Sequence, residues 1–117
     1  MCIRDRHSNL RVIYAIIKYL FILLFIFKME KFVVFGRYCE DAIFKREPFR
    51  EQHLNRLKNL KDRDILVTLG PTKCTKYLFG IFNANDENEL KDLIEEDIYW
   101  EKGIWINYEI YPWIQAF

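Results

Sequence analysis

Apolar residues change their spacing several times along the chain, and each change predicts a different element. A continuous apolar run extends from Val12 to Phe27, interrupted only by Lys18. Residues 31–37 (KFVVFGR) form a short run rich in Val and Phe, which is typical of a strand. Residues 41–63 have a helical pattern that Pro48 divides. We therefore expect a short turn up to Glu47 and a main helix that begins at Pro48, because the fixed φ of proline suits a first helical turn.

The main helix carries one apolar stripe that includes a histidine. Its members recur at spacings of four, four and three residues, and they are Phe49, His53, Leu57 and Leu60. Leu54 lies beside this stripe, whereas Arg56 and the lysines that follow it should point elsewhere. The stripe predicts the helix face that packs on a sheet.

Two strands, a helix and a last strand follow. The strands are expected over residues 65–69 and 77–82, and Gly70-Pro71 should end the first of them. Asp86 can cap a helix whose apolar face includes Leu90 and Ile94, and Asp97 can cap a short turn. Strict alternation of side chains predicts the last strand over residues 104–111.

The resulting order is β-α-β-β-α-β, a ferredoxin-like α+β fold. Two helices can cover only one face of a four-stranded sheet, yet the third strand is apolar on both faces. Trp105 and Tyr111 should add to the uncovered face, opposite the isoleucines of the last strand. An apolar face without a helix must meet a partner, so we expect a homodimer that packs sheet against sheet.

Charge separates the first 28 residues from the rest. The chain of 117 residues has a net charge of +1, but residues 1–28 carry five basic side chains and one acidic one, whereas residues 29–117 carry 13 and 16. The opening MCIRDR resembles a translated sequencing-adapter scar. We interpret residues 1–28 as a spurious extension and Met29 as the true start, with a targeting or membrane-anchor segment as the alternative. Residues 29–117 form the expected domain.

Past Met29 the sequence has one histidine, and it lies on the apolar stripe. His53 has two interpretations: a core histidine bonded to a backbone carbonyl, or a general base at the edge of a pocket. Asp97 is the candidate partner, either as a simple cap or as the acceptor of the His53 ring N–H. Gly70-Pro71 forms either an ordinary turn or part of a pocket wall.

Other chemistry finds little support in the sequence. Cys39 and Cys74 stand alone without metal-ligand spacing, so we expect reduced thiols and no metal or other cofactor. No glycine-rich phosphate loop is present. The net −3 of residues 29–117 argues against nucleic acid as a partner.

Several segments together resemble the YCII-related (YciI-like) family. They are FVVFGRYCED (32–41), KREPFREQHLNRLKNL (45–60), LGPT (69–72), DIYWEKGIW (97–105) and WIQAF (113–117). The resemblance covers residues 29–117 and none of residues 1–28. It implies a dimeric α+β barrel of ferredoxin-like subunits. It also implies a histidine–aspartate pair in a small pocket, which falls here on His53 and Asp97. The family usually has proline after this aspartate, and here Ile98 stands there.

The resemblance implies a small acid–base enzyme, either a lyase like the dehydrochlorinase among its relatives or a hydrolase-like enzyme. Its substrate would be a small organic molecule. His53 and Asp97 would be catalytic. Arg50, one turn before His53, would bind an anionic group of the substrate, with a solvated side chain as the alternative, and Gly70, Pro71 and Tyr99 would bind substrate as part of the pocket wall. The alternative is a non-catalytic dimeric module that binds a small ligand. We expect a cytoplasmic protein, with the plastid stroma or a membrane anchor as alternatives.

Overall fold

Four antiparallel strands form the sheet of the computed structural model. They are β1 (Glu30–Tyr38), β2 (Leu66–Pro71), β3 (Tyr77–Ala84) and β4 (Trp105–Trp113). Their order across the sheet is β2-β3-β1-β4, so the first and third strands are central. The structure describes the backbone of residues 2–117 and the side chains of residues 9–22 and 29–117. Strand order and chain order together confirm the predicted ferredoxin-like α+β fold.

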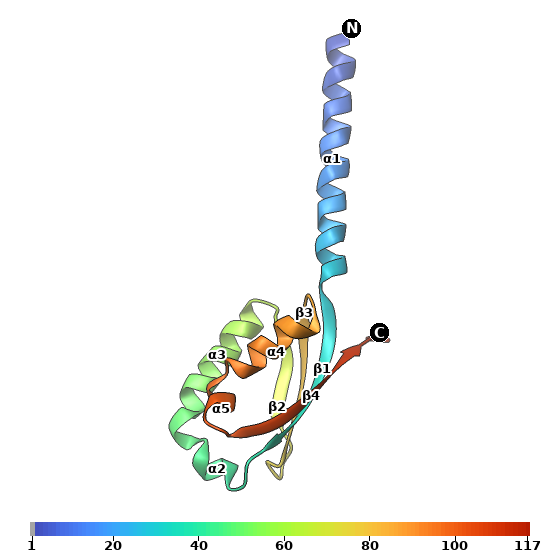
Figure 1. Ribbon diagram of the computed structural model, residues 1–117. Coiled ribbons are helices and arrows are strands. Elements are labelled where there is room, and N and C mark those ends of the chain that lie inside the picture. Colours follow the sequence, from blue (N-terminus) through green and yellow to red (C-terminus); the bar gives the residue numbers. More distant parts are fainter. Residues whose placement is uncertain (1) are drawn as a thin grey trace.

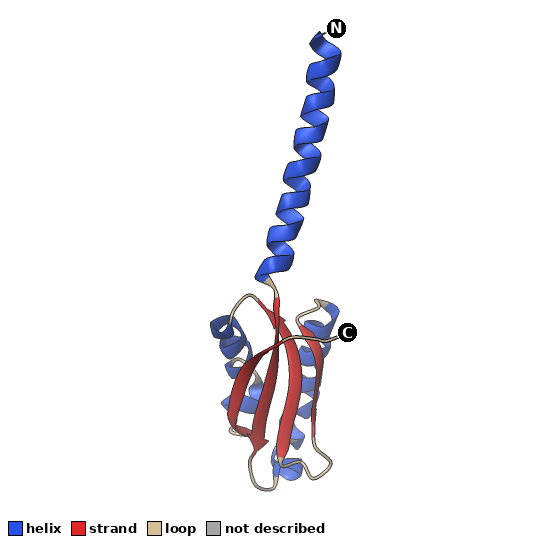
Figure 2. Ribbon diagram, turned by 90° about the vertical axis from the view of Figure 1, so that its right-hand side faces the viewer, coloured by secondary structure: helices blue, strands red, loops and turns tan. Residues whose placement is uncertain are grey.

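The helices of the domain lie on one face of this sheet (Figures 1 and 2). They are α2 (Ala42–Lys45), the 3₁₀ turn η1 (Glu47–Phe49), α3 (Arg50–Asp62), α4 (Glu87–Glu95) and α5 (Ile98–Glu101). Both predicted caps are present, because the Glu89 N–H donates to Asp86 Oδ1 over 2.8 Å and the Tyr99 N–H donates to Asp97 Oδ1 over 2.9 Å. Two layers therefore enclose one core.

Two predicted boundaries are wrong, and proline is involved in both. The main helix α3 begins at Arg50, because Pro48 lies in the tighter turn η1 that precedes it. Gly70 and Pro71 do not end β2 but belong to it, where they pair with Phe79 and Leu78 of β3. A proline is tolerated there because β2 is an edge strand, whose outer N–H groups need no partner.

The core fills the space between the sheet and the helices. Alternate residues of β1 and β3 point into it, among them Phe32, Val34, Leu78 and Phe82. Helix α4 adds Leu90 and Ile94, and α3 adds Leu60. Leu60, Leu90 and Ile94, which the helical spacing places on apolar faces, are thus buried as expected.

Trp105 departs from the predicted alternation. It was expected on the uncovered face, but it is only 4% exposed and packs under the helices. The β1–β4 pairing shifts its register between Arg37 and Tyr38, so that Tyr38 pairs with Trp105. Such an irregularity re-aims a side chain, which explains why Trp105 and its predecessor Ile104 are both buried.

The opposite face of the sheet has no helix over it and is rich in aromatic residues. Phe35 is 48% exposed and lies at its centre, 5.3 Å from Phe79 and 6.4 Å from Tyr111 between ring centroids. Tyr77 and Trp113 extend the same face through the strand register. We call these five residues the open-face aromatic cluster. It confirms that β3 is apolar on both faces.

Helix α1 (Cys2–Lys28) leads away from the two-layer domain (Figures 1 and 2). Each of its described side chains, residues 9–22, is exposed. In the part of the chain that the structure describes, no helix combines the length and apolar character needed to cross a membrane. The remaining side chains of the expected extension, residues 1–8 and 23–28, lie outside the described residues.

Candidate functional site

His53 and Asp97 form a buried hydrogen-bonded pair. His53 Nδ1 lies 2.7 Å from Asp97 Oδ1, and the two residues are 4% and 0% exposed. A carboxylate only accepts, so the proton of this bond sits on Nδ1 and the neutral ring has an unprotonated Nε2. The partner of His53 is therefore the carboxylate and not a backbone carbonyl.

Asp97 is held by two further donors. Its Oδ1 accepts the Tyr99 backbone N–H, and its Oδ2 accepts Arg56 Nη1 over 3.0 Å. Ile98 occupies the first position of α5, where a backbone N–H needs no helical partner. The family's usual proline is therefore not required for the turn that orients Asp97.

Arg56 does not point away from the site, contrary to the sequence prediction. Its guanidinium spans Asp97 and the Leu93 carbonyl, which accepts Nη2 over 2.7 Å. Residues three apart on a helix share a face, so Arg56 and His53 both reach back to the same carboxylate. The fork geometry of arginine allows one side chain to tie α3 to the end of α4.

Aromatic rings fix the orientation of the His53 imidazole. The Tyr99 ring stacks on it with centroids 3.6 Å apart and planes 10° apart. Trp105 meets the same imidazole edge-on at 5.2 Å. Contacts on the face and the edge of the ring leave it little rotational freedom, which is what an oriented proton acceptor needs.

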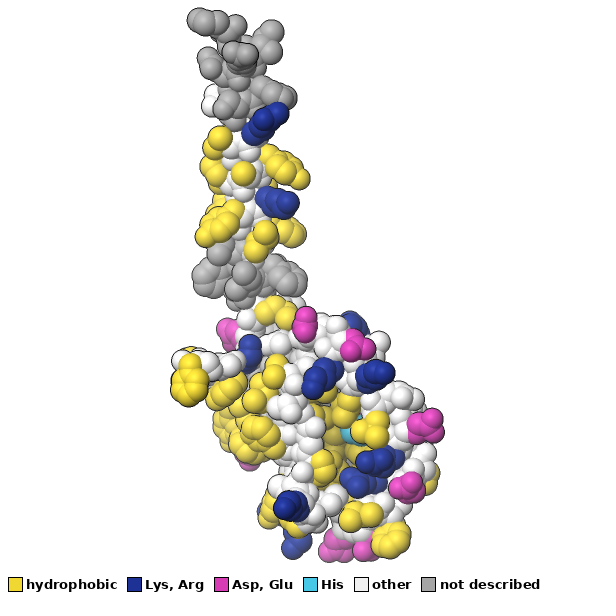
Figure 3. Space-filling model, turned by 180° about the vertical axis from the view of Figure 1, so that it is seen from behind, with side chains coloured by type: hydrophobic (Ala, Val, Ile, Leu, Met, Phe, Trp, Pro, Cys, Tyr) yellow, Lys and Arg dark blue, Asp and Glu magenta, His cyan; other side chains and the backbone are white. Residues whose placement is uncertain are grey.

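A cavity of about 140 Å³ opens beside His53, between α3 and the end of β2. Five of the sequence-predicted site residues line it, namely Arg50, His53, Gly70, Pro71 and Tyr99. Asp97 is absent from the wall and lies behind the imidazole. Figure 3 shows histidine surface on this side of the molecule, framed by hydrophobic and basic side chains.

The other wall residues were not singled out from the sequence. They are Tyr38, Arg46, Leu54, Leu57 and Leu69. Arg46 and Arg50 stand four residues apart on either side of Pro48, a spacing that could have linked them. No sequence signal brings Tyr38 here, because it reaches the cavity through the irregular end of β1.

The two tyrosines that line the cavity, Tyr38 and Tyr99, both have a raised pKa. Burial raises the pKa of Tyr38, and burial also raises the pKa of Tyr99. The positive charge of Arg46 opposes the shift in each case. With a raised pKa both side chains keep their hydroxyl protons at neutral pH, and so both can donate hydrogen bonds.

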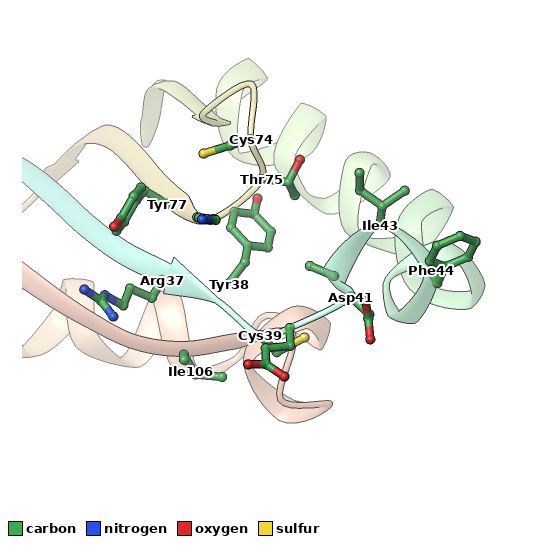
Figure 4. Close-up of a pocket in the computed structure, with 13 residues that line it drawn as sticks. Arg37, Tyr38, Cys39, Asp41, Ile43, Phe44, Cys74, Thr75, Tyr77 and Ile106 are labelled. Atoms are coloured by element: carbon green, nitrogen blue, oxygen red, sulfur yellow. The ribbon is translucent and has the colours of Figure 1, made fainter.

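A larger cavity of about 630 Å³ lies away from His53, between the end of β1 and the β2–β3 connection (Figure 4). Cys39 and Cys74 line it, and both are free thiols. The Thr72 hydroxyl lies 3.2 Å from Cys74 Sγ and lowers the pKa of that exposed thiol. None of the predicted site residues lines this cavity.

The described residues hold no cluster of three or more His, Cys, Asp or Glu side chains that could bind a metal ion. The chemistry of the site therefore has to be argued from His53, Asp97, the two tyrosines and the arginines.

The fold and the site together define a class of protein. Its members have a ferredoxin-like α+β domain with a buried histidine–aspartate pair beside a small cavity. Within that class, the YCII-related domain matches residues 30–114, which is most of the chain. The chain therefore belongs to the YCII-related family. This result confirms the resemblance noted in the sequence.

The fold is shared with a solved structure. That structure is 5-chloro-2-hydroxyhydroquinone dehydrochlorinase (TftG) from Burkholderia phenoliruptrix AC1100, in complex with 2,5-dihydroxybenzoquinone. The TM-score is 0.64 at 20% sequence identity, and the match covers 74% of this chain and 95% of that one. A comparison with curated proteins finds no match.

Proposed function

We propose that this chain is a small acid–base enzyme of the lyase or hydrolase type that acts on a small organic molecule. One observation carries the proposal: His53 Nδ1 is bound to Asp97 over 2.7 Å while the imidazole lines a cavity. This arrangement leaves Nε2 as the proton acceptor on the cavity side of the pair. Family membership and the fold shared with a dehydrochlorinase support the same chemistry.

The division of roles follows from the contacts. His53 takes a proton from the substrate, and Asp97 holds the tautomer and stabilises the imidazolium that forms. In an elimination of HCl, the proton would pass to His53, the electron pair of its broken bond to carbon would form the new double bond, and chloride would leave with the electron pair of the carbon–chlorine bond. Arg50, Gly70, Pro71 and Tyr99 would position the substrate, since all four line the cavity.

The active form in this proposal is a homodimer in the cytoplasm. The open-face aromatic cluster supports a second copy of the chain as its cover, because a symmetric interface needs one self-complementary apolar patch. Dimer formation would remove Phe35 and its neighbours from water. The cavity lies on the helix side of the sheet and so stays separate from this contact.

Replacement of His53 tests the catalytic role. Chloride release from 5-chloro-2-hydroxyhydroquinone should fall by about 10²- to 10⁴-fold in His53→Asn, the usual contribution of a general base. Glu51→Gln is the matched control, because Glu51 is an exposed neighbour on the same helix turn. Its rate should equal that of the unchanged chain.

A second measurement covers other acid–base reactions of small cyclic molecules. Proton–deuterium exchange at the ring carbons of unchlorinated 2-hydroxyhydroquinone can be followed by NMR in heavy water. Exchange that depends on His53 would support proton abstraction even without a leaving group. Binding of this compound without either reaction would favour the alternative function, a non-catalytic ligand-binding module.

A further inference from the structure

The cavity beside His53 is lined by positive charge without a matching negative one. Arg46 and Arg50 both contribute to its wall, and no Asp or Glu does. Neither arginine forms an ion pair within the described residues, whereas Arg56 is engaged with Asp97. Asp97 is not part of the wall, and its counter-charge is Arg56 at 3.0 Å. A wall with these two unpaired arginines attracts an anion.

Arg46 carries a donor that lacks an acceptor. Its Nε is buried and has no hydrogen-bond partner in the described part of the chain. Buried polar groups in proteins are nearly always paired, so the Arg46 guanidinium is not saturated by acceptors of the described residues. A ligand oxygen that reaches this guanidinium would be an acceptor for it, and a charged oxygen would bind more strongly than a neutral one.

Tyr38 and Tyr99 line the same cavity as the two arginines. The charges of Arg46 and Arg50 both lower the pKa of Tyr99 against the larger effect of burial, which raises it. Both guanidinium groups are therefore close enough to act on the Tyr99 side chain. Tyr38, whose hydroxyl stays protonated because burial raises its pKa, adds a neutral donor beside them.

The rest of the wall is apolar, and the space is small. Leu54, Leu57, Leu69 and Pro71 face the cavity, whose volume is about 140 Å³. A protein cavity of about 150 Å³ is known to hold one benzene molecule. Apolar walls of this size enclose a single six-membered ring, so that a second ring would extend out of the cavity.

We propose that this cavity selects a single-ring organic anion whose charged oxygens are held by Arg46 and Arg50. The ring then lies among the leucines and Pro71, next to the imidazole of His53. This inference rests on the proposed function only in placing the substrate in the same cavity. It assigns to Arg46 the role of principal anchor.

Binding of inert probes to the full chain tests the proposal without requiring turnover. The NMR signals of the His53 ring, assigned by comparison with His53→Asn, report occupancy of the cavity. Benzoate should shift them and saturate, whereas neutral benzyl alcohol should bind at least tenfold more weakly. The anion 2-naphthoate, with two fused rings, should also bind at least tenfold more weakly because it exceeds the space.

Arginine variants identify the anchor. Arg46→Gln should weaken benzoate binding by about tenfold or more, the usual effect of losing a charge-assisted hydrogen bond, and Arg46→Lys should recover part of it. Arg50→Gln provides the same test should Arg46→Gln fail to fold. Arg63→Gln is the control, because Arg63 is exposed and bonds only Asn59 on its own helix. Benzoate binding should be unchanged there.

The results separate this inference from the proposed function. Equal affinities for benzoate and benzyl alcohol, or benzoate binding that is unchanged in both Arg46→Gln and Arg50→Gln, would overturn anion selection even if His53 proves catalytic. Benzoate binding that depends on Arg46 would support anion selection even if no proton transfer is found.

Discussion

The same strands make both faces of the sheet, but helices cover one face and leave the other open. The helix-covered face packs its apolar side chains into the core and places a polar pair, His53 and Asp97, among them. The open face exposes aromatic side chains such as Phe35 and Phe79 and holds no comparable buried pair among its described residues. The helices thus exclude water from the His53–Asp97 pair, whereas an uncovered apolar surface favours association.

The largest expected effect is on the covered face. Asp97→Ala should lower the free energy of unfolding by about 3–5 kcal/mol, because it leaves the buried His53 and the partly buried Arg56 without their shared partner. Urea denaturation followed by circular dichroism measures this change.

Glu96→Ala is the matched control for Asp97. Glu96 is the next-door carboxylate, exposed and 3.8 Å from Arg56 Nη2. Its loss should cost less than about 1 kcal/mol, as is usual for an exposed ion pair. Equal losses in the two variants would contradict the view that burial makes the Asp97 contacts strong.

The next effect concerns the open face. Phe35→Glu should raise the dissociation constant of the proposed dimer by about 100-fold or more, because symmetry brings two carboxylates into an apolar contact. Sedimentation at a series of protein concentrations gives the constant. Phe44→Glu should leave it unchanged, since Phe44 is 82% exposed on α2, away from the sheet. An unaltered chain that stays monomeric at micromolar concentration would refute the dimer.

The smallest expected effect is that of removing α1. It tests whether the stability of the domain depends on this helix. A chain that starts at Met29 should unfold with a free energy within about 0.5 kcal/mol of the full chain, the range for changes that touch no buried group. The described side chains of α1 are all exposed, so none contributes to the core. Thermal unfolding of the two chains compares them directly, and a large loss of stability would show that α1 is part of the fold.

Much of the fold could be predicted because it depends on local pattern. The apolar runs of β1 and β3 and the cap at Asp86 depend only on residues close in sequence, and the structure agrees with them. The boundaries at Pro48 and Pro71 could not be predicted. A proline fits a 3₁₀ turn or an edge strand as well as a helix start or a turn, and only the neighbours select among these.

The candidate site also has one part that the sequence predicts and another that depends on the tertiary structure. The sequence by itself supplied the candidate residues: one histidine past Met29, a late aspartate, and Arg50 one turn before the histidine. Only the tertiary structure decided that Asp97 meets His53, that Arg56 joins them, and that Tyr38 and Arg46 complete the cavity. The physical reason is that His53 and Asp97 lie 44 residues apart, so their contact depends on how α3 and α5 pack on one sheet and not on spacing along the chain.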